Sequence, residues 1–164
     1  MSSISNITCT RWWIIDYDKE GNYILIAAMH TTNYSDTFIE VAEDCPVAAA
    51  QVPPEKGGEK TVASLQLDMI QTAPYRYTSD DVIFGVYALR NSIPDSELEA
   101  ERTRFFSKGQ PCLRSSPLAK RYGWGFHSDA EGKVAAYPLG SEEYQKLAAD
   151  QSLKHVKAMR SKRA

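Results

Sequence analysis

The run of residues 82–89, with the sequence VIFGVYAL, constrains the fold of this chain more than any other segment. Both sets of alternating positions are apolar, so an extended chain here would have a hydrophobic surface on each side. Such a segment is buried as a strand in the middle of a sheet that is covered on both faces. The polar residues 78–81 before it are typical of a turn. The sequence therefore predicts a central strand over residues 82–89.

Helical patterns lie on both sides of this run. In the first, Thr61 is a suitable N-cap and Pro74 ends the helix, while apolar residues recur with helical spacing at positions 62, 65, 69 and 70. In the second, Asp95 or Ser96 is the cap, and Ser96 stands three residues before a glutamate, which is the spacing of a capping box. Gly109 is a natural stop for this second helix.

Two shorter helices are expected toward the C-terminus. The first begins at Ser116, which is followed by a proline at its preferred first position, and runs to Gly123. The second begins at Ser141, and two glutamates occupy its first turn. The apolar stripe of this last helix continues, after a break, through residues 153, 156 and 159.

Several other stretches have the composition of strands. Residues 37–42 form one strand, and residues 124–127 and 133–137 form a hairpin with a short connection. Residues 11–28 fit a second hairpin around a charged turn, although their two apolar arms are also compatible with a helix. The order of elements predicts an α+β, or mixed α/β, fold. We expect a single small domain in which a mixed sheet of about four to five strands has three helices packed on it.

Composition excludes several classes of partner. The formal charge of −2 gives no basic domain, so nucleic acid is not expected as a partner. No run approaches the ~18 apolar residues of a spanning helix, and the N-terminus does not resemble a signal peptide, so no membrane association is expected. The three cysteines are too scattered for a disulfide framework or a metal knuckle, which favours reduced thiols and a cytoplasmic location. Neither a metal nor a cofactor is expected.

The segment 107–127, SKGQPCLRSSPLAKRYGWGFH, has the most features of a binding site. It contains Lys108, Arg114 and Arg121 without an acidic residue, and Trp124 adds an aromatic ring. Its Ser-Pro helix start exposes backbone N–H groups that attract anions. The segment matches no known phosphate loop, and a loop of solvated charges around a structural turn is the alternative. Our first hypothesis is a binding domain for an anionic small molecule or partner.

Two other hypotheses use different residues. In an enzyme, Cys112 with His127 would act as nucleophile and base, or Asp80 and Asp81 would act as paired acids. Asp80 is also a candidate ligand-binding residue, because it lies at the end of a predicted strand, although adjacent acids in turns most often act as caps. In an interaction protein, the basic tail of residues 154–164 would recruit an acidic partner.

Five motifs in a fixed order resemble a known family. They are residues 30–34 (HTTNY), 37–46 (TFIEVAEDCP), 74–81 (PYRYTSDD), 109–114 (GQPCLR) and 122–127 (YGWGFH). Together they are similar to the family catalogued as domain of unknown function 6157, over about residues 29–163. The resemblance implies a small cytosolic domain, and it brings no established activity and no catalytic residue.

The resemblance also bears on the organisation of the chain. Members of the family look as if they begin with Met-His-Thr-Thr-Asn-Tyr, which starts here at Met29. We therefore expect residues 29–164 to form a single α+β domain and residues 1–28 to be an N-terminal extension. That extension is either a genuine additional hairpin or a segment that the native protein lacks.

Overall fold

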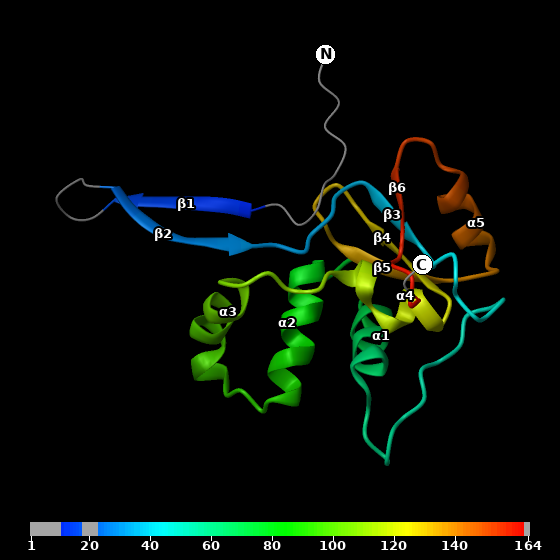
Figure 1. The fold of residues 1–164 in the computed structure, drawn as a ribbon, viewed down its shortest axis with the longest axis horizontal. Helices are drawn as coiled ribbons and strands as arrows, with labels where there is room; N and C mark the ends of the chain where they lie inside the picture. The colour runs from blue at the N-terminus through cyan, green and yellow to red at the C-terminus, as the bar shows by residue number, and fades with distance from the viewer. Residues whose placement is uncertain (1–10, 18–22, 163–164) are drawn as a thin grey trace.

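A mixed sheet with the strand order β5-β4-β3-β6 lies at the centre of the structure, a computed structural model that describes residues 11–17 and 23–162 (Figure 1). Its strands are β3 (Thr37–Glu40), β4 (Trp124–Ser128), β5 (Val134–Pro138) and β6 (Lys154–Lys157). β3 and β4 pair antiparallel, as do β4 and β5, whereas β3 and β6 run parallel. The predicted α+β fold with a mixed sheet is confirmed, and so are the strand that begins at Thr37 and the hairpin that begins at Trp124.

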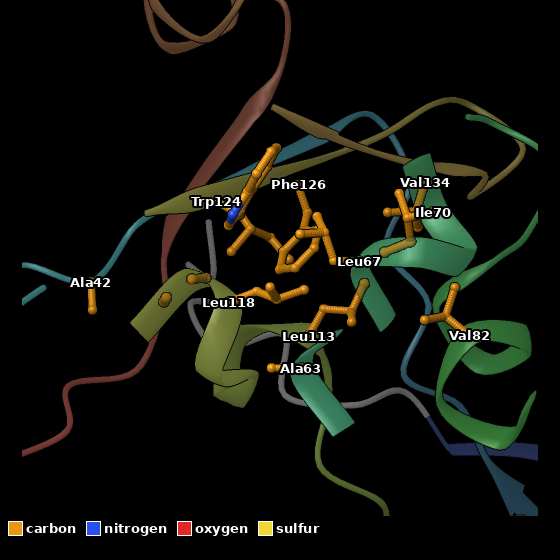
Figure 2. Packing of buried hydrophobic residues seen from close by; sticks show 13 residues of the cluster. Ala42, Ala63, Leu67, Ile70, Val82, Leu113, Leu118, Trp124, Phe126 and Val134 are labelled. Carbon is orange, nitrogen blue, oxygen red and sulfur yellow. The ribbon is translucent and has the colours of Figure 1, made fainter. Parts of the chain in front are cut away.

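One face of this sheet packs on helices α1 (Val62–Thr72) and α4 (Pro117–Arg121) and forms the main hydrophobic core (Figure 2). Side chains alternate between the two faces along a strand. Ile39 of β3 and its cross-strand partner Phe126 therefore both point into this core, where Leu118 of α4 joins them. All three side chains are almost completely buried, and burial of this kind is the main favourable contribution to folding.

The opposite face of the sheet carries aromatic side chains and contacts helix α5 (Glu142–Ala149). Phe38 points to this side, where its ring packs edge-on against Tyr144 with the centroids 5.0 Å apart. The Tyr144 hydroxyl accepts a hydrogen bond from the Val41 N–H at 3.0 Å, which ties the helix to the end of β3. Gly125 of β4 lies against both rings and leaves no room for a larger residue.

The predicted caps begin three of the helices. The hydroxyl groups of Thr61, Ser116 and Ser141 each accept a hydrogen bond from a backbone N–H in the first turn of α1, α4 and α5. These caps satisfy donors that the helix itself leaves unpaired, and the starts of the three helices are confirmed.

The predicted central strand over residues 82–89 is wrong, because this segment belongs to helix α2 (Ser79–Arg90). The polar residues before it are the cap of the helix. The Thr78 hydroxyl accepts from the Asp81 N–H, and the Asp81 carboxylate accepts from the Thr78 N–H. The helix is apolar on several sides because it packs between α1 and α3 (Leu98–Phe106). A short apolar run of this kind fits a buried helix as well as a buried strand.

α2 and α3 share a second hydrophobic cluster. The Arg102 guanidinium lies over the rings of Phe84 and Phe106, with its central carbon 5.5 and 5.4 Å from their centroids. It also donates to Asp81 at 2.9 Å, so this side chain covers the cluster while its charged end is paired. The helix itself is confirmed, but it follows a 3₁₀ turn, Asp95–Glu97, and no side chain provides the predicted cap.

The predicted helical stripe through residues 153, 156 and 159 is wrong, because residues 154–157 form strand β6 and the residues on either side are not helical. β6 pairs with β3, and the Ala158 N–H continues this pairing by donating to the Glu40 carbonyl at 2.8 Å. The edge of β3 would otherwise leave its backbone groups unpaired. The hydrogen-bonding requirement of the sheet therefore overrides the helical spacing of these apolar residues.

Two further strands, β1 (Arg11–Tyr17) and β2 (Tyr23–His30), pair antiparallel in a separate two-stranded sheet. Their pairing is the arrangement that the hairpin expected over residues 11–28 requires. Residues 18–22 of its turn lie outside the described residues. β2 continues through Met29, so the expected start of the native domain falls within this strand, and the assignment of residues 1–28 to an extension stays a prediction.

The loop between β2 and β3 is fixed to the N-terminus of α2 by Asp80. One carboxylate oxygen of Asp80 accepts from the backbone N–H and the hydroxyl of Thr32, and the other accepts from the Thr31 hydroxyl, each at 2.7 Å. In return, the Asn33 side chain accepts from the Asp80 N–H at 2.9 Å. Asp80 and Thr32 are both buried, and a carboxylate is favourable at a helix N-terminus. The loop and the helix therefore hold each other in place.

Replacing Asp80 with alanine is expected to reduce the free energy of unfolding by about 2–4 kcal/mol, because the buried Thr32 N–H then lacks an acceptor and the link from the Thr31 hydroxyl to α2 is lost. Asp95→Ala is the matched control, because it removes an exposed carboxylate that has no hydrogen bond or ion pair with a described residue. It should change the stability by less than about 0.5 kcal/mol. Urea denaturation measures both values, and equal losses in the two variants would contradict the role given to Asp80.

Replacing Gly125 with alanine is expected to destabilise the fold by about 1–3 kcal/mol through overpacking. The added Cβ would lie 2.7 Å from Tyr144 Cε2, 3.0 Å from Phe38 Cζ and 3.1 Å from the Ile39 carbonyl oxygen. Gly109→Ala is the control, because the nearest atom to its Cβ is 3.9 Å away. Thermal unfolding compares the two, and a Gly125→Ala variant as stable as the control would show that the face of α5 can move aside.

Candidate functional site

A cavity of about 380 Å³ lies between α1, α2 and the chain that joins α3 to α4. Figure 1 shows this connecting chain running past α2 on its way to α4. We call the cavity the α1–α2 pocket. Its lining residues are Val62, Gln66, Ile83, Val86, Tyr87, Arg90, Asn91, Phe105, Gln110, Pro111, Cys112, Ser115, Ser116 and Pro117.

Helical spacing brings the side chains of this pocket together. Val62 and Gln66 lie one turn apart on α1, and Ile83, Tyr87 and Arg90 lie on one side of α2. The sequence analysis missed Gln66 and Arg90 as site residues. A strand over residues 82–89 ends before Arg90 and would place that residue on the opposite side from Ile83 and Tyr87. The capping box before this run was the signal that would have placed all three residues on one helix face.

Three lining side chains have hydrogen-bond donors for which no described residue provides an acceptor. The Arg90 guanidinium makes no ion pair within the described part of the chain, and the Tyr87 hydroxyl makes no hydrogen bond there. Gln66 is only 7% exposed; its Oε1 accepts from the Ser116 hydroxyl at 2.7 Å, and its side-chain nitrogen has no partner among the described residues. No carboxylate is among the residues described as lining the pocket, so it offers free donors and one positive charge.

Cys112 forms part of the wall of the pocket and contacts a residue outside it. Its Sγ lies 3.5 Å from the hydroxyl oxygen of Tyr34, from the loop before β3. Burial raises the pKa of Tyr34 above its ordinary value, and the hydrogen bond to Cys112 adds to this effect. The positive charge of Arg114 acts in the opposite direction. The net result is a neutral hydroxyl at neutral pH.

The structure separates the cations of segment 107–127 from the pocket that this segment helps to form. Gln110, Pro111 and Cys112 line the α1–α2 pocket, but Lys108, Arg114 and Arg121 are not lining residues. Lys108 and Arg121 are exposed, and Arg114 Nε donates to the Lys157 carbonyl at 2.9 Å, which connects the segment to β6.

The remaining predicted binding residues support the fold. Trp124 is 7% exposed and belongs to the main core, and its indole N–H donates to the Gln51 carbonyl at 2.8 Å (Figure 2). Asp80 holds the loop before β3, and Asp81 caps α2 and pairs with Arg102. Both acids are therefore engaged in hydrogen bonds within the fold, as caps usually are.

His127 has other partners than the cysteine with which the sequence analysis paired it. Its Nδ1 lies 2.7 Å from the Tyr75 hydroxyl, which in turn lies 2.8 Å from the Tyr137 hydroxyl. Burial lowers the pKa of His127, which favours the neutral ring. Tyr75 has a left-handed φ of 57°, a conformation that costs energy in a non-glycine residue. No hydrogen bond joins Cys112 to His127, although both residues are described.

The described part of the basic tail is bound to acids of its own chain. Lys157 and Arg160 both form ion pairs with Glu43, and the backbone N–H groups of Ser161 and Lys162 donate to the Asp44 carboxylate. The arginine lowers the pKa of Glu43 below its usual range, since it stabilises the charged carboxylate. These cations already have a partner within the protein.

The described residues offer neither a metal cluster nor a membrane-spanning helix. They hold no group of three or more histidine, cysteine or acidic side chains arranged to bind a metal ion. Among the helices described, none combines the length and the apolar character required to cross a membrane.

Comparison with known proteins gives one match. No curated protein and no solved structure matches the chain. A family model described as a family of unknown function, DUF6157, matches residues 29–164. This match begins at Met29, the residue at which the sequence resemblance also begins. Because the model covers most of the sequence, the chain belongs to the DUF6157 family.

Proposed function

We propose that the protein binds a small organic acid in the α1–α2 pocket. The observation that carries this proposal is the lining of the pocket, which combines the free donors of Arg90, Gln66 and Tyr87 with no described carboxylate. Such a site favours ligands whose oxygens accept hydrogen bonds, and above all those with a negative charge. The ligand is still an anionic small molecule, but its negative charge is bound by Arg90 of α2 and not by the cations of segment 107–127.

The apolar part of the lining suggests the body of the ligand. Val62, Ile83, Val86 and Phe105 contribute hydrophobic surface on several sides of the pocket. A cavity of about 380 Å³ is within the range of small-molecule sites, which are mostly apolar with a few well-placed polar groups. We therefore infer a ligand with an aliphatic or aromatic body and one acidic group.

The segment 107–127 has a more limited part in this proposal. It supplies the wall that includes Gln110, Cys112 and Ser116, and through Ser116 it fixes the orientation of the Gln66 amide. Lys108, Arg114 and Arg121 are not required, because none of them lines the pocket. Mutation can therefore compare Arg90, which lines the pocket, with the cations of segment 107–127, which do not.

Ligand-observed NMR with matched fragments tests the proposal. Small aliphatic and aromatic carboxylic acids are compared with their primary amides on the unmodified protein and on Arg90→Gln. The acids are expected to bind more tightly than the amides. Arg90→Gln should weaken acid binding about tenfold, because it removes the charged partner, and should leave amide binding nearly unchanged.

Lys108→Gln is the matched control for this experiment, since it removes an exposed cation of segment 107–127 that does not line the pocket. It should leave acid binding unchanged. The proposed function would be refuted if acids and amides bound equally well, or if Lys108→Gln weakened the acids as much as Arg90→Gln.

A further inference from the structure

The thiol of Cys112 is placed differently from that of Cys45, the other cysteine among the described residues. Both side chains are half-buried and free of disulfides. Only Cys112 lines the α1–α2 pocket, and only Cys112 has a hydroxyl next to its sulfur, at 3.5 Å. A nucleophilic atom therefore forms part of the same wall as the free donors.

Tyr34 holds this sulfur in position. A tyrosine hydroxyl is protonated at neutral pH, and burial raises the pKa of Tyr34 further, so this hydroxyl can donate to the sulfur. The loop that carries Tyr34 is itself fixed to α2 through the hydrogen bonds of Thr31 and Thr32 to Asp80. Tyr34 is thus a positioning residue for the thiol.

Gln66 gives an independent indication that the pocket takes a ligand. The Ser116 hydroxyl accepts from the Leu118 N–H, so its own proton is available for Gln66 Oε1 at 2.7 Å. This orientation directs the amide nitrogen away from Ser116. A side chain that is 7% exposed then presents two N–H donors, without a described acceptor, to the pocket, where a ligand oxygen can replace solvent as their acceptor.

Resting on the proposed binding of a small acid, we propose that the Cys112 thiol adds reversibly to the carbonyl carbon of an acid that is also an aldehyde or a ketone. A bond forms between Sγ and the carbonyl carbon, and the π electron pair of the carbonyl moves to its oxygen. The thiol proton ends on that oxygen. No group leaves and no other reactant is consumed, so the product is a hemithioacetal or hemithioketal.

Each side chain of the pocket has a distinct part in this reaction. Arg90 binds the carboxylate of the ligand, and the Gln66 amide donates to the carbonyl oxygen, on which negative charge develops during addition. Tyr34 orients the sulfur. His127 is not required, since its ring is hydrogen-bonded to Tyr75.

The probe for this proposal is glyoxylate labelled with ¹³C at its aldehyde carbon, with labelled acetaldehyde as the matched aldehyde that lacks an acid. Carbon NMR of the full chain is expected to show a protein-bound hemithioacetal signal with glyoxylate. The signal should persist in Cys45→Ser and disappear in Cys112→Ser. Acetaldehyde should need about tenfold higher concentration for the same occupancy, because it gains nothing from Arg90.

Two further variants test the assigned parts. Arg90→Gln should lower the affinity for glyoxylate about tenfold, to that for acetaldehyde. Tyr34→Phe should weaken the hemithioacetal signal while leaving unchanged the binding of acetate, an acid that cannot form the adduct. A purely structural defect at Tyr34 would weaken acetate binding as well.

The possible failures are distinguishable. A signal that remains in Cys112→Ser, or no signal with a protein that still binds acetate, would overturn the covalent step and leave the proposed function standing. Equal occupancy by glyoxylate and acetaldehyde, unaffected by Arg90→Gln, would overturn both the acid selectivity argued here and the proposed function.

Discussion

The carboxylate of Asp80 supports the arrangement on which the rest of the structure depends. It receives three hydrogen bonds from Thr31 and Thr32 and lies in the first turn of α2, so the loop before β3 and the helix are fixed to one another. Tyr34, in that loop, reaches Cys112, and Arg90 lies at the far end of the helix. A buried carboxylate is tolerated here because its oxygens are satisfied by donors.

The proposed site depends on a balance between satisfied and unsatisfied polar groups. Asp80 and Trp124 have hydrogen-bond partners within the fold, and they serve its stability. Gln66 is equally buried, yet its amide nitrogen has no partner among the described residues, and the nearby Arg90 has no described carboxylate beside it. The collection of donors without described acceptors around one cavity, one of them on a buried side chain, is the feature that distinguishes this proposed site from the core.

Local chemistry made much of the fold predictable. Hydroxyl caps at Thr61, Ser116 and Ser141 fixed the starts of three helices, because a cap depends only on residues within one turn. The hairpin of β4 and β5 was equally readable from strand-forming residues on both sides of a polar turn. The errors fell at α2 and β6, where apolar spacing alone does not distinguish a helix from a strand and the neighbouring elements decide.

The sequence by itself determined the class of fold and most element boundaries, since these depend on neighbouring residues. It also determined the family, through five motifs in a fixed order, and it singled out segment 107–127 as a candidate binding segment. Only the tertiary structure decided which residues of that segment face a cavity. It placed Cys112 beside Tyr34 and apart from the hydrogen bonds of His127, and it brought Gln66 and Arg90 to the same pocket. These contacts join residues distant in the chain, and they follow from how α2 packs between two helices, which no local pattern contains.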